Sequence, residues 1–113
     1  MNDDLSIKNI LEMSYILWDK HKDTWSPMEP EYGKLFLLYM IEEVGEVISI
    51  IKKKEEKLIM NDDIVRKHFI EEMGDILMYF SDVLNRFNIK PEEFTKVYIE
   101  KFEHNLKRDY HYD

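Results

Sequence analysis

The sequence contains no cysteine. A disulfide, a thiolate metal ligand and a cysteine nucleophile are therefore all excluded. The alternation of apolar and polar residues that marks a half-buried strand is also missing, so no strand is expected. These two absences leave an all-α protein without thiol chemistry.

Basic residues and long apolar runs are also scarce. The chain has 16 Lys and Arg against 24 Asp and Glu, a formal net charge of −8. Binding to a nucleic-acid polymer needs clustered Lys and Arg, so we expect no such partner. No apolar run approaches the roughly 18 residues of a membrane span, and the first residues, MNDDLS, lack the apolar segment of a signal peptide. We therefore expect a cytoplasmic protein that does not contact a membrane.

Length and periodicity predict a single domain over residues 1–113. With 113 residues, 44% of them hydrophobic, the chain suits one modest core. Apolar residues recur three or four positions apart in four segments, which is typical of amphipathic helices. The predicted helices cover about residues 5–20, 33–56, 64–87 and 91–108, with a loop over 21–32 and a turn over 58–63. Helices joined in this way form a four-helix bundle.

One eight-residue pattern occurs in both middle helices. Residues 41–48 read IEEVGEVI and residues 70–77 read IEEMGDIL. Acids three positions apart lie one turn apart on a helix of roughly 3.6 residues per turn. Each copy therefore presents two carboxylates on one face, Glu43 with Glu46 and Glu72 with Asp75.

The direction of these acids distinguishes a site from a solvated surface. Glu43 and Glu72 fall inside the apolar arcs of their helices, whereas Glu42 and Glu71 lie on the polar side. A carboxylate that faces a core costs several kcal/mol unless it is paired or bound to a metal, and the same arcs contain no Lys or Arg. The pattern favours a divalent cation between the second and third helices; the alternative is a pair of merely solvated acidic faces.

The donor set restricts the choice of metal. Carboxylates without Cys or His favour hard cations, Mg²⁺ first and Mn²⁺ second, and Mg²⁺ is commonly held together with substrate phosphates. A di-iron site would need Glu-x-x-His on two helices. Glu46 and Asp75 occupy those histidine positions, so a di-iron site is not expected.

Two further segments contain candidate binding residues. Tyr98, Lys101, Asn105 and Arg108 share one face of the last helix. They suit a phosphate chain, or they form a solvated basic stripe near a helix end. Trp25, in a loop with two prolines, is either a hydrophobic plug over the bundle end or a platform for a flat ligand.

The acidic motifs resemble those of MazG-type nucleotide pyrophosphohydrolases, of the all-α NTP pyrophosphatase superfamily. The signature of that family is Glu-Glu-x-x-Glu followed by Glu-x-x-Asp, with Lys-x-x-x-Asn-x-x-Arg on the last helix. The matching residues are Glu42, Glu43, Glu46, Glu72, Asp75, Lys101, Asn105 and Arg108. The similarity extends from about Trp18 to Arg108, which is most of the chain.

The resemblance implies an Mg²⁺-dependent hydrolysis of a nucleoside triphosphate between its α and β phosphates. It assigns metal binding to four acids, Glu43, Glu46, Glu72 and Asp75. It implies that Glu42 orients or deprotonates the attacking water, and that Lys101 and Arg108 stabilise charge on the phosphates. It also implies contacts of Tyr98 and Asn105 with phosphate or sugar, and stacking of Trp25 on the base.

The same resemblance implies a homodimer or homotetramer in which one subunit completes the site of another. Gly45 and Gly74, each in the middle of a predicted helix, also suggest close packing against another helix or subunit. Two rival functions remain open. One is the hydrolysis of phosphoribosyl-ATP, and the other is a non-catalytic metal- or nucleotide-binding module that regulates a partner protein.

Overall fold

The first, third and fourth helices begin where the sequence provides a capping side chain or a first-turn proline. In the computed structural model, which describes residues 4–108, Ser6 accepts a hydrogen bond from the Asn9 amide at 3.1 Å and starts the first helix. Asp62 accepts from the amides of Ile64 and Val65, both at 3.0 Å, and starts the third. Pro91 occupies the first turn of the fourth, where its missing N–H has no cost. The elements are α1 (Ile7–His21), the 3₁₀ turn η1 (Pro30–Tyr32), α2 (Gly33–Asn61), α3 (Asp63–Arg86) and α4 (Pro91–Lys107).

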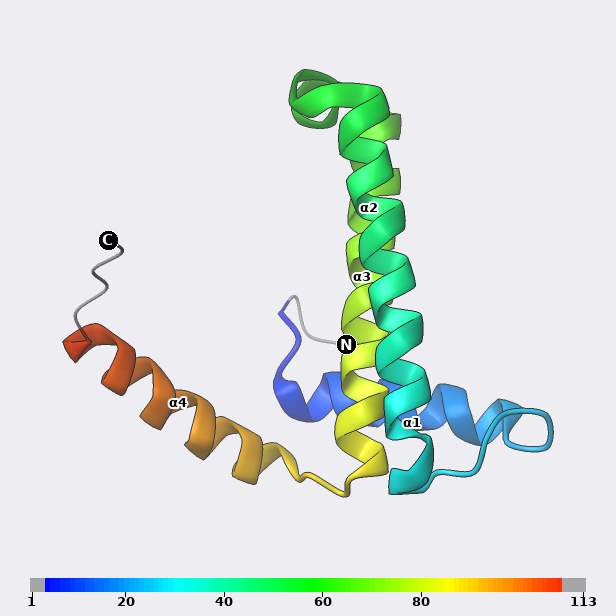
Figure 1. The fold of residues 1–113 in the computed structure, drawn as a ribbon, viewed down its shortest axis with the longest axis vertical. Helices are drawn as coiled ribbons and strands as arrows, with labels where there is room; N and C mark the ends of the chain where they lie inside the picture. The colour runs from blue at the N-terminus through cyan, green and yellow to red at the C-terminus, as the bar shows by residue number, and fades with distance from the viewer. Residues whose placement is uncertain (1–3, 109–113) are drawn as a thin grey trace.

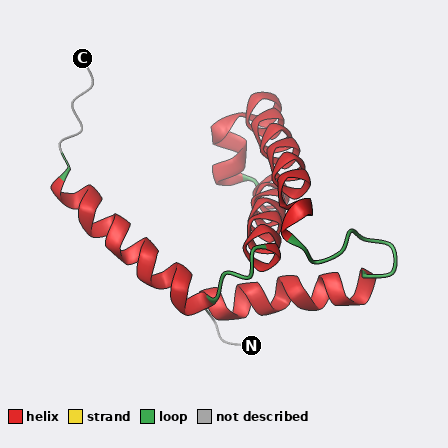
Figure 2. Cartoon of the chain, turned by 60° about the horizontal axis from the view of Figure 1, so that its bottom comes forward, coloured by secondary structure: helices red, strands yellow, loops and turns green. Residues whose placement is uncertain are grey.

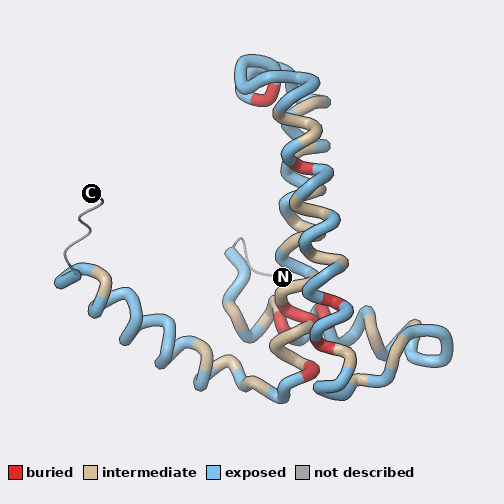
Figure 3. Tube along the Cα trace, in the orientation of Figure 1, coloured by how far each residue is buried: buried red, intermediate tan, exposed pale blue. Residues whose placement is uncertain are grey.

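The second and third helices form the body of the molecule. They run side by side in opposite directions as one long hairpin, and α1 crosses the base of that hairpin (Figure 1). Buried residues gather at this crossing, with few further up the hairpin (Figure 3). The buried apolar residues among those described are Leu11, Phe36, Val47 and Ile59. The core of a single chain is therefore small and lies mainly at the base.

The fourth helix leaves the hairpin. It extends away from α2 and α3 in both views (Figures 1 and 2). Near its start Phe94 meets Phe80 of α3, with ring centroids 5.7 Å apart, but further along Val97, Phe102 and Leu106 are 59%, 55% and 70% exposed. The expected all-α fold with four helices and an acidic cluster between α2 and α3 is confirmed, and within residues 4–108 no helix covers Val97, Phe102 and Leu106 of α4.

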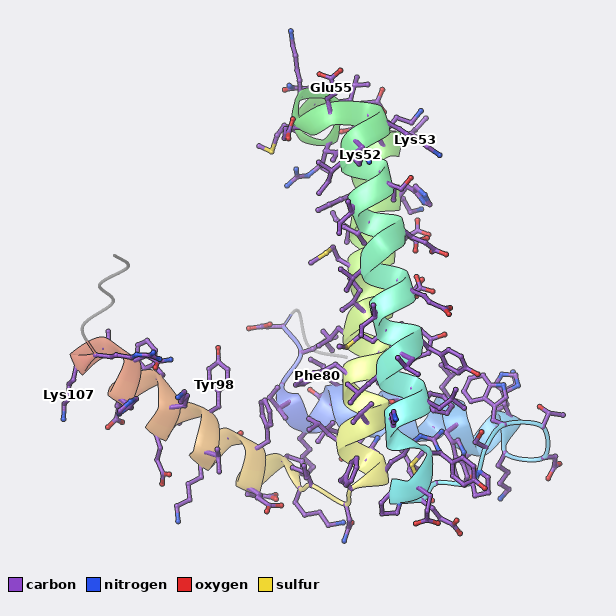
Figure 4. The ribbon with its side chains drawn as sticks, viewed as in Figure 1. Lys52, Lys53, Glu55, Phe80, Tyr98 and Lys107 are labelled. Atoms are coloured by element: carbon purple, nitrogen blue, oxygen red, sulfur yellow. The ribbon has the colours of Figure 1, made fainter. Side chains whose placement is uncertain are left out.

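The second helix is longer than the sequence indicates. A turn is predicted over residues 58–63, but α2 continues to Asn61. The chain changes direction earlier, at Glu55, where φ is 63° and ψ is 159°. Residues 56–61 then form a short helical segment, which ends where the Asp62 amide donates to the Leu58 carbonyl at 2.8 Å. This segment caps the tip of the hairpin, where Glu55, Lys52 and Lys53 lie (Figure 4).

Candidate functional site

Three carboxylates meet between the two long helices. Glu43 and Glu46 come from α2 and Glu72 from α3, and one oxygen of each lies within 4.8 Å of the others. The spacing of three residues places the first two on one face of α2, as the repeated motif predicts. Glu43 and Glu72 are half-buried, whereas Glu46 is exposed. The cluster is therefore open on one side.

The acidic cluster concentrates negative charge and contains two buried oxygens without a hydrogen-bond partner. Glu43 and Glu72 each have one buried carboxylate oxygen without a hydrogen-bond partner. Burial raises the pKa of Glu43 to about 7, and the nearby carboxylates of Glu72 and Glu46 act in the same direction. Burial and then the charge of Glu43 also raise the pKa of Tyr79. A divalent cation would satisfy these oxygens, and an all-oxygen donor set suits a hard cation.

The other two predicted acids of the motif are arranged differently. Asp75 lies one turn after Glu72 on α3 and lines the same cavity as Glu43, but it is not part of the group of three. Glu42 is exposed. The structure thus brings Glu43, Glu46 and Glu72 together, places Asp75 on the wall of the adjoining cavity, and leaves Glu42 on the solvent side of α2.

A cavity of about 520 Å³ opens beside the cluster. Glu43 and Asp75 are its acidic end, and aromatic side chains form much of its wall. The lining residues are Ser14 and Leu17 from α1, Thr24, Trp25 and Ser26 from the loop, Phe36, Tyr39 and Glu43 from α2, and Asp75, Met78, Tyr79 and Asp82 from α3. A volume of this size, with an apolar wall and a few polar groups, is typical of a small-molecule site.

Trp25 is part of the wall of this cavity. Its ring stacks on His21 with centroids 4.7 Å apart and planes at 22°, and the residue is 38% exposed. It contacts the end of α1 while one side stays accessible. This position is compatible with a platform for a flat ligand, which is one of the two roles that the sequence allows for Trp25.

A buried arginine holds the Trp25 loop in place. Arg86 is 2% exposed and donates two hydrogen bonds to the carboxylate of Asp82. Its Nη1 atom donates to the carbonyls of Ser26 and Pro27, and its guanidinium lies 3.7 Å from the centre of the Phe36 ring. The Trp18 indole also donates to the Ser26 carbonyl, at 2.9 Å. The loop is thereby fixed to α1 and α3, and Arg86 itself packs against Phe36 of α2.

Sequence reasoning missed four of these residues, Tyr39, Tyr79, Asp82 and Arg86. The sequence does indicate that Tyr79 and Asp82 share one face of α3 with Asp75, because they follow it by four and seven positions. Arg86 follows Asp82 by four positions on the same face, but its contacts with the loop gave no signal, since the acceptors there are backbone carbonyls.

The predicted phosphate-binding residues of α4 do not line the cavity of the same chain. Tyr98 is 64% exposed, and Lys101 and Arg108 are exposed as well. Figure 4 shows Tyr98 and Lys107 on a helix that runs away from the hairpin. Asn105 differs in having a buried side-chain oxygen without a hydrogen-bond partner. The acidic and basic halves of the predicted site are therefore separate within one chain.

Of the comparisons with known proteins, the one with family models finds a match. Within residues 4–108, no helix is both long and apolar enough to span a bilayer. No curated protein and no solved structure shows significant similarity to the chain. One family model, described as the MazG nucleotide pyrophosphohydrolase domain, matches residues 32–108. That match covers more than half of the chain, including both acidic helices and α4, so the chain belongs to the MazG nucleotide pyrophosphohydrolase family.

Proposed function

We propose that the protein hydrolyses a nucleoside triphosphate between its α and β phosphates, with Mg²⁺ as cofactor and Mn²⁺ as a substitute. The products are a nucleoside monophosphate and pyrophosphate. The observation that supports this most directly is the pair of buried, unpartnered oxygens of Glu43 and Glu72, because Glu43 also lines a cavity with several aromatic residues. Membership of the family supports the reaction class.

In this proposal the acids of α2 and α3 hold the metal. Glu43, Glu46 and Glu72 supply ligands from the cluster, and Asp75 supplies one from the adjoining cavity wall. A bound Mg²⁺ polarises phosphoryl oxygens and lowers the pKa of a bound water. The exposed Glu42 orients or deprotonates the attacking water. Trp25 offers its accessible ring face to the base.

The test of the reaction is pyrophosphate release from a panel of NTPs, dNTPs and phosphoribosyl-ATP, with Mg²⁺ and then with EDTA. We expect release that stops with EDTA and is lost in Glu43→Gln or Asp75→Asn, while the helical circular dichroism is unchanged. Glu71→Gln is the matched control, because Glu71 is an exposed acid in the same motif. Preference for phosphoribosyl-ATP would select that rival. A folded protein that binds Mg²⁺ and nucleotide but releases no pyrophosphate would be the non-catalytic module.

We further propose that the working form is a homodimer or homotetramer. Two apolar stripes centred on glycine lie exposed on the hairpin. On α2, Ile41 and Ile48 are 60% and 51% exposed on either side of Gly45; on α3, Ile70 and Leu77 are 56% and 43% exposed on either side of Gly74. A Cβ atom added at either glycine would meet nothing within 4 Å in the chain. Such stripes suit close approach of helices from a second subunit.

Self-association also offers a way to complete the site. Lys101, Asn105 and Arg108 do not line the cavity of their own chain, so α4 of a neighbouring subunit is the source of phosphate contacts in this proposal. Ile48→Asp puts a charge in the apolar stripe of α2 and should shift the mass measured by light scattering towards the monomer. Ile64→Asp, at an 82% exposed site near the hairpin tip, should leave the mass unchanged. A wild-type protein that is monomeric at all concentrations would refute the assembly.

A further inference from the structure

The cavity beside the acidic cluster has a second charged end that the metal site does not use. Asp75, Tyr79 and Asp82 all line it from α3. At about 1.5 Å rise per residue, Asp82 lies about 10 Å along the helix from Asp75, which is the length scale of a nucleoside 5′-phosphate from phosphorus to base. Trp25 and Phe36 line the cavity together with Asp82. A nucleotide with its phosphates at the acidic cluster would therefore bring its base towards Asp82.

Asp82 is held rigidly and has unused acceptor capacity. Its side chain is 8% exposed, and Arg86 donates one hydrogen bond to each of its two oxygens. A carboxylate oxygen accepts more than one hydrogen bond, so an acceptor site remains on each. Within residues 4–108, Arg86 is the side chain that donates to Asp82. The carboxylate is thus positioned as an acceptor on the cavity wall.

The other polar groups near this end are neutral hydroxyls. Ser14 and Thr24 line the cavity, and the Thr24 hydroxyl already donates to the His21 carbonyl at 3.3 Å. Asp82 is therefore the group that distinguishes one base from another most strongly. An acceptor-only carboxylate gains a charge-assisted bond from an N–H donor and is left unpaired, at a cost, by a base that presents carbonyls.

We propose that Asp82, fixed by Arg86, selects nucleotides whose base carries an exocyclic amino group. Cytosine, adenine and guanine each offer an amino donor at the edge of the ring. Uracil and thymine offer only the N3–H, which lies between two carbonyl oxygens that would face the carboxylate. The inference rests on the proposed function, because it assumes that the cavity holds a nucleotide.

The test compares matched nucleotides on one preparation of the full chain. We expect kcat/KM for dCTP and dATP to exceed that for dUTP and dTTP by about tenfold or more. Calorimetry with the α,β-imido analogues of dCTP and dUTP in Mg²⁺ should give the same order of affinities. Because each result is a ratio within one sample, the fraction of folded protein cancels.

Variants at Asp82 and Arg86 distinguish recognition of the base from a purely structural role of these residues. Asp82→Asn, which presents both a donor and an acceptor, should bring the dCTP to dUTP ratio close to one. Arg86→Lys keeps the charge but not the two-point bond, and should lower the ratio mainly through KM for dCTP. Ser81→Ala is the control, because Ser81 is buried next to Asp82 but bonds to the Leu77 carbonyl of its own helix. Its ratio should equal that of the wild type.

The outcomes distinguish this inference from the proposed reaction. Equal turnover of dCTP and dUTP, or an unchanged ratio in Asp82→Asn, would overturn the role of Asp82 while the reaction stands. Absence of pyrophosphate release, with the imido analogues still ranked by their amino group, would overturn the reaction and support the recognition. Failure to bind either analogue would overturn the recognition.

Discussion

Glu43 and Glu72 face each other across the α2–α3 interface, each with one buried oxygen that no donor satisfies. Two ionised carboxylates at this separation repel each other, and burial strengthens the repulsion. The ion pairs Lys22–Asp19 and Arg86–Asp82 lie elsewhere. The metal-free hairpin therefore contains a local electrostatic penalty that a cation, or a proton, relieves.

Mg²⁺ should consequently stabilise the fold. At about ten times its dissociation constant, a ligand of the native state adds about 1.4 kcal/mol, or about 5 °C in a domain of this size. Thermal unfolding with increasing MgCl₂ measures the shift. Glu43→Gln should abolish it and Glu71→Gln should retain it, because Glu71 is exposed and outside the cluster. An unaltered midpoint in the wild type would argue against a metal at this cluster.

Without metal, stability should fall as the pH rises. The pKa of Glu43 is raised from 4.5 to about 7 in the folded chain, so the folded state binds this proton more tightly than the unfolded state. The stabilisation is fully present below about pH 4.5 and is lost as the pH passes 7. Urea midpoints between pH 5 and pH 8 in EDTA, at about one-unit steps, should decline in the wild type.

Glu43→Gln isolates the contribution of this carboxyl. Burial also raises the pKa of Asp82, against the opposing effect of Arg86, so the contribution of Asp82 has the same sign as that of Glu43. Identical slopes in the variant and the wild type would assign the pH dependence to other groups.

If α4 serves the site of a neighbouring subunit, two inactive variants should complement each other. Glu43→Gln lacks a metal ligand and Lys101→Ala lacks a phosphate contact. A dimer that contains one chain of each type has one site with both defects and one intact site, so random mixing should restore about a quarter of the wild-type activity. The measurement is pyrophosphate release after the two variants are mixed under conditions that exchange subunits. A mixture as inactive as its components would place Lys101 in the same site as Glu43 of its own chain.

The sequence predicts the acidic cluster because the repeated motif places Glu43 and Glu72 inside apolar arcs, and the pairing of α2 with α3 buries those arcs. The sequence does not predict the direction in which α4 runs. Val97, Phe102 and Leu106 require an apolar partner, but their spacing does not say whether it comes from the same chain or another. The cavity wall depends on hydrogen bonds from Arg86 to loop carbonyls. Because these acceptors are backbone atoms, the pattern of side chains in the sequence does not predict them.

The break in α2 is another feature that the apolar periodicity of the sequence does not predict. Residues 52–57 read KKKEEK, a run of good helix formers. Yet Glu55 has a φ of 63°, which directs the following helical segment across the hairpin tip. The tip is therefore set by how residues 56–61 pack, with Ile59 buried at 7% exposure, and not by a breaker residue.

The backbone conformation of Glu55 leads to a prediction about stability. A residue with a side chain at positive φ and extended ψ is strained, and glycine is not. Glu55→Gly should therefore raise the free energy of unfolding by about 1 kcal/mol, as measured by urea denaturation. Glu56→Gly is the matched control, because Glu56 is also exposed but lies in the helical segment that follows, where glycine costs about 1 kcal/mol. Opposite signs at two adjacent glutamates are expected only if the chain turns at Glu55, and destabilisation by both changes would mean that the helix continues through it.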